Sequence, residues 1–144
     1  MKKTQEEAKR LELKSEQLLR KFETQLGARD FLVKSKKHLD FGCGYGFFAK
    51  TLGKRYPKMS VIPIDFDRES ISNARKYRKL GNIIYKCTGK ISGKYDSISV
   101  TYVLHDVKNL KTVLKQLWKS LNSGGKIIIS DFKSLGGMVI KNGL

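Results

Sequence analysis

The chain has 144 residues, which is enough for one domain with its own core and too few for two. Its 30 Lys and Arg residues outnumber 13 Asp and Glu, and the resulting net charge of +17 attracts phosphates, acidic proteins or anionic lipids without selecting among them. Two cysteines without a CxxC pair argue against a metal site or a disulfide framework, and no run approaches the roughly 18 apolar residues of a membrane span, so a reducing, cytoplasmic setting is expected.

Residues 5–26 are predicted to form an amphipathic helix that ends near Gly27. Its apolar residues recur at helical spacing: Ala8, Leu11, Leu18, Leu19, Phe22 and Leu26. Acidic side chains balance much of its basic face, which favours a cap over the domain core rather than a membrane-binding or calmodulin-type helix. The first lysines lead straight into polar residues, so no secretory signal is predicted. We assign residues 1–35 to a helical cap on a single domain.

From residue 38 onward, apolar runs alternate with helical patterns. The expected strands lie in the runs "HLDFG", "SVIPIDFD", "NIIYKC", "YDSISVTYV" and "GGKIIISDF", and the expected helices span 47–56, 69–80 and 109–121. Strands that alternate with helices are joined by right-handed crossovers and form a mostly parallel sheet with helices on both faces. The sequence therefore predicts an α/β fold with a doubly wound, mostly parallel sheet, whose core runs from 36 to 132.

Three glycines follow the first expected strand at alternate positions, in the stretch Asp40-Phe41-Gly42-Cys43-Gly44-Tyr45-Gly46. In a doubly wound sheet, ligands bind where the first strand turns into its helix, and glycine lets the backbone take positive φ and lets a ligand come close. The spacing is not the dinucleotide fingerprint, because the third glycine comes one position too early, and no Lys-Ser or Lys-Thr pair completes a phosphate loop. The helix N-terminus that follows suits a carboxylate or a phosphate.

A second acid stands at the tip of the second expected strand. Asp65 ends the run "VIPID", where a carboxylate is well placed to accept hydrogen bonds from the hydroxyls of a ribose. The alternative role for such a residue is a helix cap, but Asp67 is the better cap because it directly precedes the helical pattern. We therefore favour the ligand role for Asp65.

Three stretches together resemble the class I S-adenosylmethionine-dependent methyltransferases: "HLDFGCGYGFFAKTL", "VIPIDFDRESISNAR" and "YDSISVTYVLHDVKNLKTVLKQLWKSLNSGGKIIISDF". The resemblance runs from about residue 37 to residue 132 and is greatest for the subgroup with a "VLHH"-like segment after the fourth strand. It implies a Rossmann-like methyltransferase fold, S-adenosylmethionine as the cofactor, and methyl transfer as the activity.

The resemblance also implies roles by position. The glycine turn contacts the methionine part of the cofactor, Asp40 assists at its amino group, Asp65 binds the ribose and Phe66 lies against the adenine. Where the family often reads the adenine amino group with an Asp after the third strand, this chain has Thr88. The full set of expected cofactor-contacting residues is Asp40, Gly42, Cys43, Gly44, Gly46, Asp65, Phe66, Thr88 and Thr101. Cys43 is not expected to act as a nucleophile, because no base stands beside it in the sequence.

Methyl transfer from a sulfonium is an in-line displacement that depends mainly on alignment and on a desolvated approach. Where the acceptor must lose a proton, His105 and Asp106 are the candidate base pair after the fourth strand, with Tyr102 as a further catalytic candidate. The alternative is structural: Asp106 as a helix N-cap and His105 as a packing residue.

The acceptor is only partly restricted by the sequence. The segment "VTYVLHD" differs from the "NPPY"-like tetrad of enzymes that methylate amino groups of DNA bases or protein glutamine, so a small-molecule acceptor is favoured. RNA stays open, because the chain is basic and has a cluster at Arg75, Lys76, Arg78 and Lys79 on a helix expected to face solvent.

After Phe132 the sequence offers a short extension, residues 133–144, where the family sheet has two more strands. We expect at most one short strand or the start of a helix there, leaving the fifth strand as an exposed edge at Ile127–Ile129. Such an edge favours association, so a homodimer or a partner subunit is expected. Three interpretations remain open: a minimal enzyme, a chain completed by a partner, and a cofactor- or nucleotide-binding module with reduced catalysis.

Overall fold

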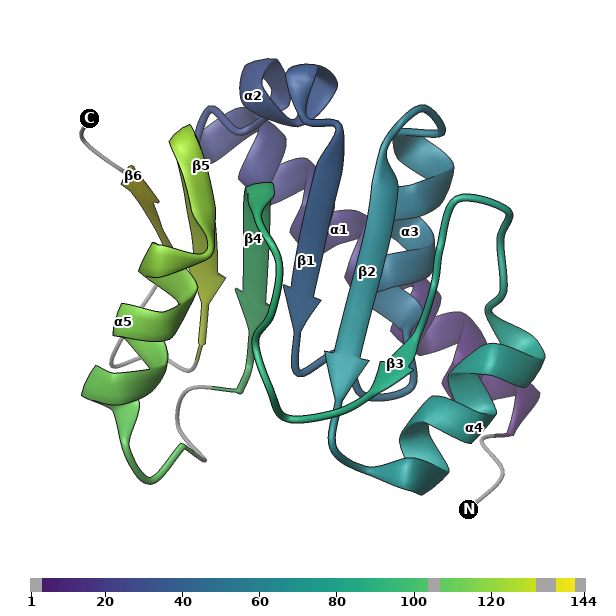
Figure 1. Ribbon diagram of the computed structural model, residues 1–144. Coiled ribbons are helices and arrows are strands. Elements are labelled where there is room, and N and C mark those ends of the chain that lie inside the picture. The colour runs from purple at the N-terminus through teal and green to yellow at the C-terminus, as the bar shows by residue number, and fades with distance from the viewer. Residues whose placement is uncertain (1–3, 104–106, 132–136, 142–144) are drawn as a thin grey trace.

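A single six-stranded sheet organises the protein, as seen in a computed structural model that describes residues 4–103, 107–131 and 137–141 (Figure 1). The elements are α1 (Gln5–Gln25), α2 (Arg29–Lys34), β1 (Lys37–Phe41), α3 (Phe47–Arg55), β2 (Ser60–Asp65), α4 (Arg68–Tyr77), β3 (Lys86–Cys87), β4 (Tyr95–Thr101), α5 (Leu110–Lys119), β5 (Leu121–Ser130) and β6 (Gly137–Lys141). The strand order is β3-β2-β1-β4-β5-β6, with β1 to β5 parallel and β6 antiparallel. This confirms the predicted doubly wound, mostly parallel α/β fold.

The two faces of the sheet carry separate apolar cores. One core joins residues of α1 to α4 with one face of the strands, and its centre includes Phe22, Leu32, Phe48 and Ile71. The other core places Leu117 of α5 against the opposite face. In Figure 1, α1 and α3 lie behind the sheet and α5 in front of it. Burying each such side chain stabilises the fold by about 1.5–3 kcal/mol, so both faces contribute.

Helix α1 covers the core, as its apolar stripe predicts. It begins with a capping box, in which the Glu7 N–H donates to Thr4 Oγ1 (3.2 Å) and the Thr4 N–H donates to Glu7 Oε2 (3.1 Å). The Phe22 ring meets Phe48 of α3 edge to face, with 5.7 Å between the ring centroids. In the described part of the chain, neither α1 nor any other helix has the length and apolarity needed to cross a membrane.

The segment between α4 and β4 departs from the prediction. The helix expected over 69–80 ends at Tyr77, and the strand expected in "NIIYKC" is reduced to Lys86–Cys87, preceded by an isolated bridge between Val61 and Ile83. The Asn82 side-chain amide donates to the carbonyls of α3 and of the loop after it, at 2.9–3.3 Å. These side-chain hydrogen bonds hold the segment near β2, where backbone pairing with β2 is short.

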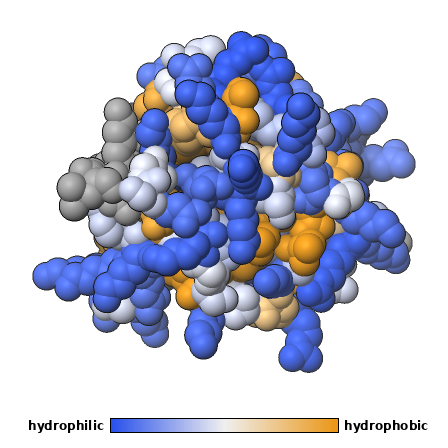
Figure 2. Space-filling model, turned by 45° about the horizontal axis from the view of Figure 1, so that its top comes forward, coloured by the Kyte–Doolittle hydropathy of each residue, from blue (hydrophilic) through white to orange (hydrophobic). Residues whose placement is uncertain are grey.

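The prediction of β5 as an exposed edge is wrong. β6 pairs antiparallel with β5 from Lys126↔Lys141 to Ser130↔Gly137, while β4 pairs with its other side. Ile127, Ile128 and Ile129 are all buried, so the edge that suggested a dimer or partner does not exist here. Figure 2 shows one face of the molecule, where hydrophilic side chains predominate and the hydrophobic patches are small.

Candidate functional site

The glycine turn joins β1 to α3 at the carboxyl end of the sheet. All three glycines have positive φ: 74° at Gly42, 54° at Gly44 and 81° at Gly46, which is the N-cap of α3. The N–H groups of Gly42 and Cys43 both donate to the Ile64 carbonyl at 2.9 Å, which fastens the turn to the end of β2. These backbone conformations favour glycine and explain its use at alternate positions.

The three glycines differ in the space around them. A Cβ at Gly42 would lie 2.4 Å from Val103 Cγ2, and one at Gly46 would lie 2.8 Å from the Tyr85 ring. A Cβ at Gly44 would meet no described atom within 4 Å. Gly42 and Gly46 are therefore required by internal packing, and Gly44 is the position where the turn is open to an approaching ligand.

Asp65 lies at the end of β2 directly beside this opening. Its Oδ2 accepts the Gly44 N–H and its Oδ1 accepts the Asp67 N–H, both at 2.9 Å. Asp67 caps α4 by accepting the Ser70 N–H at 3.1 Å, which confirms the cap that the sequence predicted. Each carboxylate oxygen of Asp65 has a second lone pair, so the residue retains the capacity to accept two hydroxyl groups.

Asp40 is the second carboxylate of the site and is buried, with 1% of its surface exposed. Its Oδ1 accepts the Ser99 hydroxyl at 2.6 Å, while its Oδ2 is buried and accepts no hydrogen bond from the described residues. Desolvation raises the pKa of Asp40 to about 7, Ser99 opposes this shift and the charge of Asp65 adds to it. A buried acceptor without a donor fits a site that receives a cationic or N–H-bearing ligand group.

Phe66 and Thr88 lie next to Asp65 at the ends of β2 and β3. The Phe66 side chain is 82% exposed, so its ring is accessible to a ligand. The Thr88 N–H donates to the Asp65 carbonyl at 2.8 Å, and its hydroxyl accepts the Lys90 N–H at 3.0 Å. The structure thus brings Asp65, Phe66 and Thr88 together at the ends of β2 and β3, where Asp65 also bonds Gly44.

The end of β4 leads to a cavity of about 750 Å³ between the sheet and α1. Its lining residues are Leu11, Lys14, Ser15, Gln17, Leu18, Lys21, Phe48, Thr101, Tyr102 and Asp131. Tyr102 has a φ of 57° and its N–H donates to the Ser130 carbonyl at 2.7 Å. His105 and Asp106, the expected base pair, lie outside the described residues.

Two supporting residues escaped the sequence analysis. Arg78, expected at the surface, is 5% exposed: it donates to the Tyr45 carbonyl in the glycine turn, and its guanidinium lies 4.0 Å from the centroid of the Phe47 ring. Tyr85 packs behind Gly46 and donates to the Arg78 carbonyl at 2.7 Å. The basic surface cluster predicted around α4 therefore does not include Arg78, because its side chain is buried against the glycine turn.

Cys43 is suited to packing rather than to chemistry. Burial is the main cause that raises the pKa of its thiol, and the charges of Asp40 and Asp65 add to it. The thiolate, which is the reactive form, is therefore scarce at neutral pH. Among the described residues, no three His, Cys, Asp or Glu side chains are arranged to hold a metal ion.

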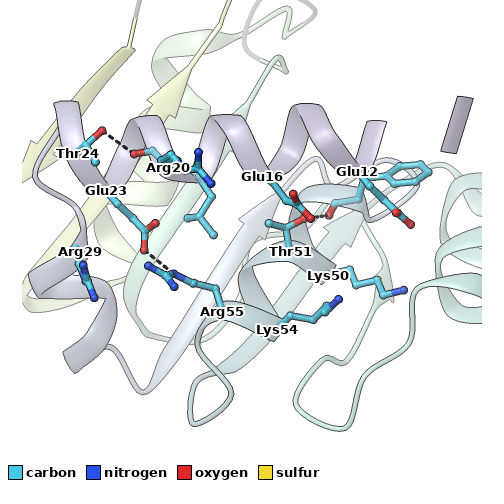
Figure 3. A pocket seen from close by; sticks show the side chains of 12 residues that line it. Glu12, Glu16, Arg20, Glu23, Thr24, Arg29, Lys50, Thr51, Lys54 and Arg55 are labelled. Atoms are coloured by element: carbon cyan, nitrogen blue, oxygen red, sulfur yellow. Dashed lines mark hydrogen bonds and ion pairs between the residues drawn. The ribbon is translucent and has the colours of Figure 1, made fainter. Parts of the chain in front are cut away.

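A second hollow, of about 630 Å³, lies along the seam of α1 and α3 (Figure 3). Side chains of both signs face each other there, and Glu23 accepts a hydrogen bond from Arg55 Nε at 3.1 Å and one from the Tyr56 hydroxyl. Thr24 and Thr51 hydrogen-bond within their own helices, to Arg20 and Phe47 carbonyls. We assign no ligand to this hollow; the ion pair between Glu23 and Arg55 joins α1 to α3 across it.

The chain is similar to known methyltransferases. A family profile described as a methyltransferase domain matches residues 9–139. The chain is 28% identical over 98 residues to a malonyl-[acyl-carrier protein] O-methyltransferase of Bacillus cereus, covering 65% of this chain and 36% of that protein. It is 27% identical over 128 residues to the protein of the same description from Legionella pneumophila, covering 81% and 44%. The chain thus spans less than half the length of these relatives.

Solved structures show the same fold. The plantazolicin methyltransferase BpumL, in complex with a pentazolic desmethylPZN analog and SAH, superposes with a TM-score of 0.63. The alignment covers 90% of this chain and 62% of that one at 22% sequence identity. At this identity the likeness concerns the fold, and the function has to be argued from the residues of the site.

Proposed function

This chain belongs to the class I S-adenosylmethionine-dependent methyltransferases, and we propose that it binds S-adenosylmethionine at the glycine turn and transfers its methyl group to a small-molecule acceptor. Bound S-adenosylmethionine would supply a methyl group already activated on a sulfonium. What the chain has to supply is therefore binding, alignment and the exclusion of water.

One observation carries the proposal: two carboxylates flank the open glycine turn at different depths. Asp40 is buried with an unpartnered Oδ2, which suits an ammonium group. Asp65 is half-buried beside Gly44, which suits the paired hydroxyls of a ribose. A ligand with an ammonium group at one end and a nucleoside at the other would satisfy both, and S-adenosylmethionine has both groups.

The remaining cofactor contacts follow from proximity to Asp65. The exposed Phe66 ring would be covered by the adenine, and Thr88 offers a hydroxyl near the ring edge. Cys43 lies in the glycine turn and Thr101 at the end of β4, and we assign both to the methionine part of the cofactor. The affinity of the cofactor is expected to come mainly from the two carboxylates and the glycine turn, since charge-assisted hydrogen bonds are stronger than neutral ones.

We place the acceptor in the cavity beside Thr101 and Tyr102, under α1. A volume of about 750 Å³ falls in the range of small-molecule sites, and its lining is largely apolar, which supports a compact acceptor over RNA. Lys14 and Lys21 stand on the α1 side of this cavity, so an acceptor with an anionic group is favoured. RNA remains the second candidate because of the net charge of +17.

We assign deprotonation of the acceptor to residues that follow β4 in the chain. Tyr102 lines the acceptor cavity, and His105 and Asp106 follow it closely in the chain, so all three stay in the proposal as catalytic candidates. The alternative function is a cofactor-binding module that acts with a partner chain and turns over slowly or not at all.

The test is a methyl-transfer assay with S-adenosylmethionine labelled on its methyl group. The protein is incubated with separate small-molecule, RNA and protein fractions, and label is expected in the small-molecule fraction. Label in RNA would replace the proposed acceptor, and cofactor binding without transfer to any fraction would favour the binding module. A Lys14→Gln, Lys21→Gln variant should lose transfer and keep cofactor affinity if the acceptor is anionic.

A further inference from the structure

A row of buried polar side chains runs through the middle of the sheet. His38 and Asp40 of β1 lie in register with Ser97 and Ser99 of β4, so that His38 is opposite Ser97 and Asp40 is opposite Ser99. Each of these four residues is 1% exposed or less. Polar groups at this depth weaken the fold unless they are hydrogen-bonded, so the partner of each group has to be identified.

The row forms one continuous chain of hydrogen bonds. Ser35, in the loop before β1, lies 2.6 Å from Ser97 through their Oγ atoms, and Ser97 Oγ lies 2.7 Å from His38 Nδ1. His38 Nε2 lies 2.8 Å from Ser99 Oγ, which lies 2.6 Å from Asp40 Oδ1. The chain thus ends on the buried carboxylate of the candidate site.

The chemistry of the groups fixes the direction of this chain. An ionised Asp40 only accepts, so Ser99 donates its single hydroxyl proton to Oδ1. Ser99 then accepts from His38, which places the imidazole proton on Nε2 and leaves Nδ1 to accept from Ser97. Burial lowers the pKa of His38 to about 3, in agreement with a neutral ring. His38 therefore orients the Ser99 hydroxyl toward Asp40.

We propose that His38 is a positioning residue for cofactor binding: through Ser99 it occupies Oδ1 of Asp40 and keeps Oδ2 available for the ammonium group of S-adenosylmethionine. The inference rests on the proposed function, because it assumes that the amino-acid end of the cofactor reaches Asp40. The resemblance gives a role to Asp40 and none to His38 or Ser99. Without His38, the Ser99 hydroxyl is no longer held toward Asp40.

The ionisation of Asp40 gives the proposal a measurable consequence. Burial raises the pKa of Asp40 to about 7; the charge of Asp65 adds to this shift, and the hydrogen bond from Ser99 opposes it. The other titratable groups near Asp40 are Cys43 and Tyr85, which are both neutral. Only the ionised form pairs with an ammonium group. Affinity for an amino-acid-bearing ligand should therefore rise about tenfold from pH 6 to pH 8, following the ionised fraction.

The experiment titrates two ligands by calorimetry between pH 6 and 8. S-adenosylhomocysteine carries the amino-acid end, and 5′-methylthioadenosine has the same nucleoside without it. The variants are His38→Gln, whose amide nitrogen reaches the position of Nε2, and His38→Asn, which reaches only the position of Nδ1. Ser99→Ala removes the last link without removing His38 and serves if His38→Asn fails to fold.

For the wild type we expect a pH-dependent affinity for S-adenosylhomocysteine and a flat one for 5′-methylthioadenosine. His38→Asn and Ser99→Ala should shift the S-adenosylhomocysteine profile to higher pH, and His38→Gln should restore it. The proposal is overturned if the wild-type profile is flat, if His38→Asn and Ser99→Ala keep the wild-type profile, or if affinity for both ligands falls equally. If the wild type binds neither ligand, the proposed function itself fails.

Discussion

Gly42 offers a direct test of how the candidate site is built. Replacing it with Ala puts a methyl group 2.4 Å from Val103 Cγ2 and 2.8 Å from Val103 Cγ1, at a backbone φ of 74°. Gly44 is the matched control, because Gly44→Ala also places Ala at positive φ but meets no described atom within 4 Å. The two variants share the backbone penalty and differ in the steric one.

The magnitudes follow from these two contributions. A left-handed conformation costs an alanine about 1–2 kcal/mol, and overpacking a core contact costs about 1–3 kcal/mol. Gly44→Ala should therefore lower the free energy of unfolding by about 1–2 kcal/mol, and Gly42→Ala by about 2–5 kcal/mol. Adding Val103→Ala to Gly42→Ala should recover about 1–3 kcal/mol relative to the sum of the single changes.

Urea unfolding followed by circular dichroism measures the wild type, the three single variants and the double variant. Equal losses for Gly42→Ala and Gly44→Ala, or strictly additive losses with Val103→Ala, would refute the claim that Val103 closes the space behind Gly42. Ligand binding should reverse the order of the two glycine variants. Gly44→Ala fills the open side of the turn, so it should weaken cofactor binding despite its small effect on stability.

Three further predictions concern the charged residues of the site. Asp65→Ala should weaken S-adenosylmethionine binding by about 1–3 kcal/mol, because ribose hydroxyls lose a charged acceptor, while Asp67→Ala should lower stability and spare affinity in the same titration. Burial raises the pKa of Asp40 to about 7 and lowers that of His38 to about 3. Between about pH 4 and 6.5, Asp40 is therefore protonated in the folded state and ionised in the unfolded chain, whereas His38 is neutral in the folded state and protonated in the unfolded chain. Acidification in this range thus stabilises the fold through Asp40 and destabilises it through His38. In Asp40→Asn only the His38 effect is left, so the free energy of unfolding should fall by about 1.4 kcal/mol per pH unit on acidification. A series of urea titrations in which this variant has the wild-type slope of stability against pH would contradict the prediction. Arg78→Lys should lower both stability and cofactor affinity, because an ammonium group cannot replace the planar guanidinium that bonds the Tyr45 carbonyl and stacks on the Phe47 ring. An unchanged urea midpoint and an unchanged affinity would show that Arg78 is dispensable.

The parts of this protein that were predictable from its sequence depend on short-range signals. The glycine turn and the cap at Asp67 each use residues adjacent in the chain, and continuous apolar runs identified the buried strands. The alternation of these elements was then enough for the doubly wound sheet. Local rules sufficed because parallel crossovers leave few topologies open.

The parts that escaped prediction depend on contacts between distant segments. Arg78 looks like one cation of a surface cluster until the fold brings Tyr45 and Phe47 beside it. The pairing of β6 with β5 comes from a short segment whose pattern also fitted the start of a helix. The alternation of Ser97 and Ser99 in β4 was a readable sign of a polar row, but its partners on β1 appear only once the register is known.

The central claim is that the glycine turn and its two carboxylates bind S-adenosylmethionine. Its most direct test is a calorimetric titration of the whole chain with S-adenosylmethionine, S-adenosylhomocysteine and NAD. We predict saturable one-to-one binding of both adenosyl ligands and none of NAD. Absence of heat for both adenosyl ligands, confirmed by equilibrium dialysis, or tight binding of NAD, would contradict the account.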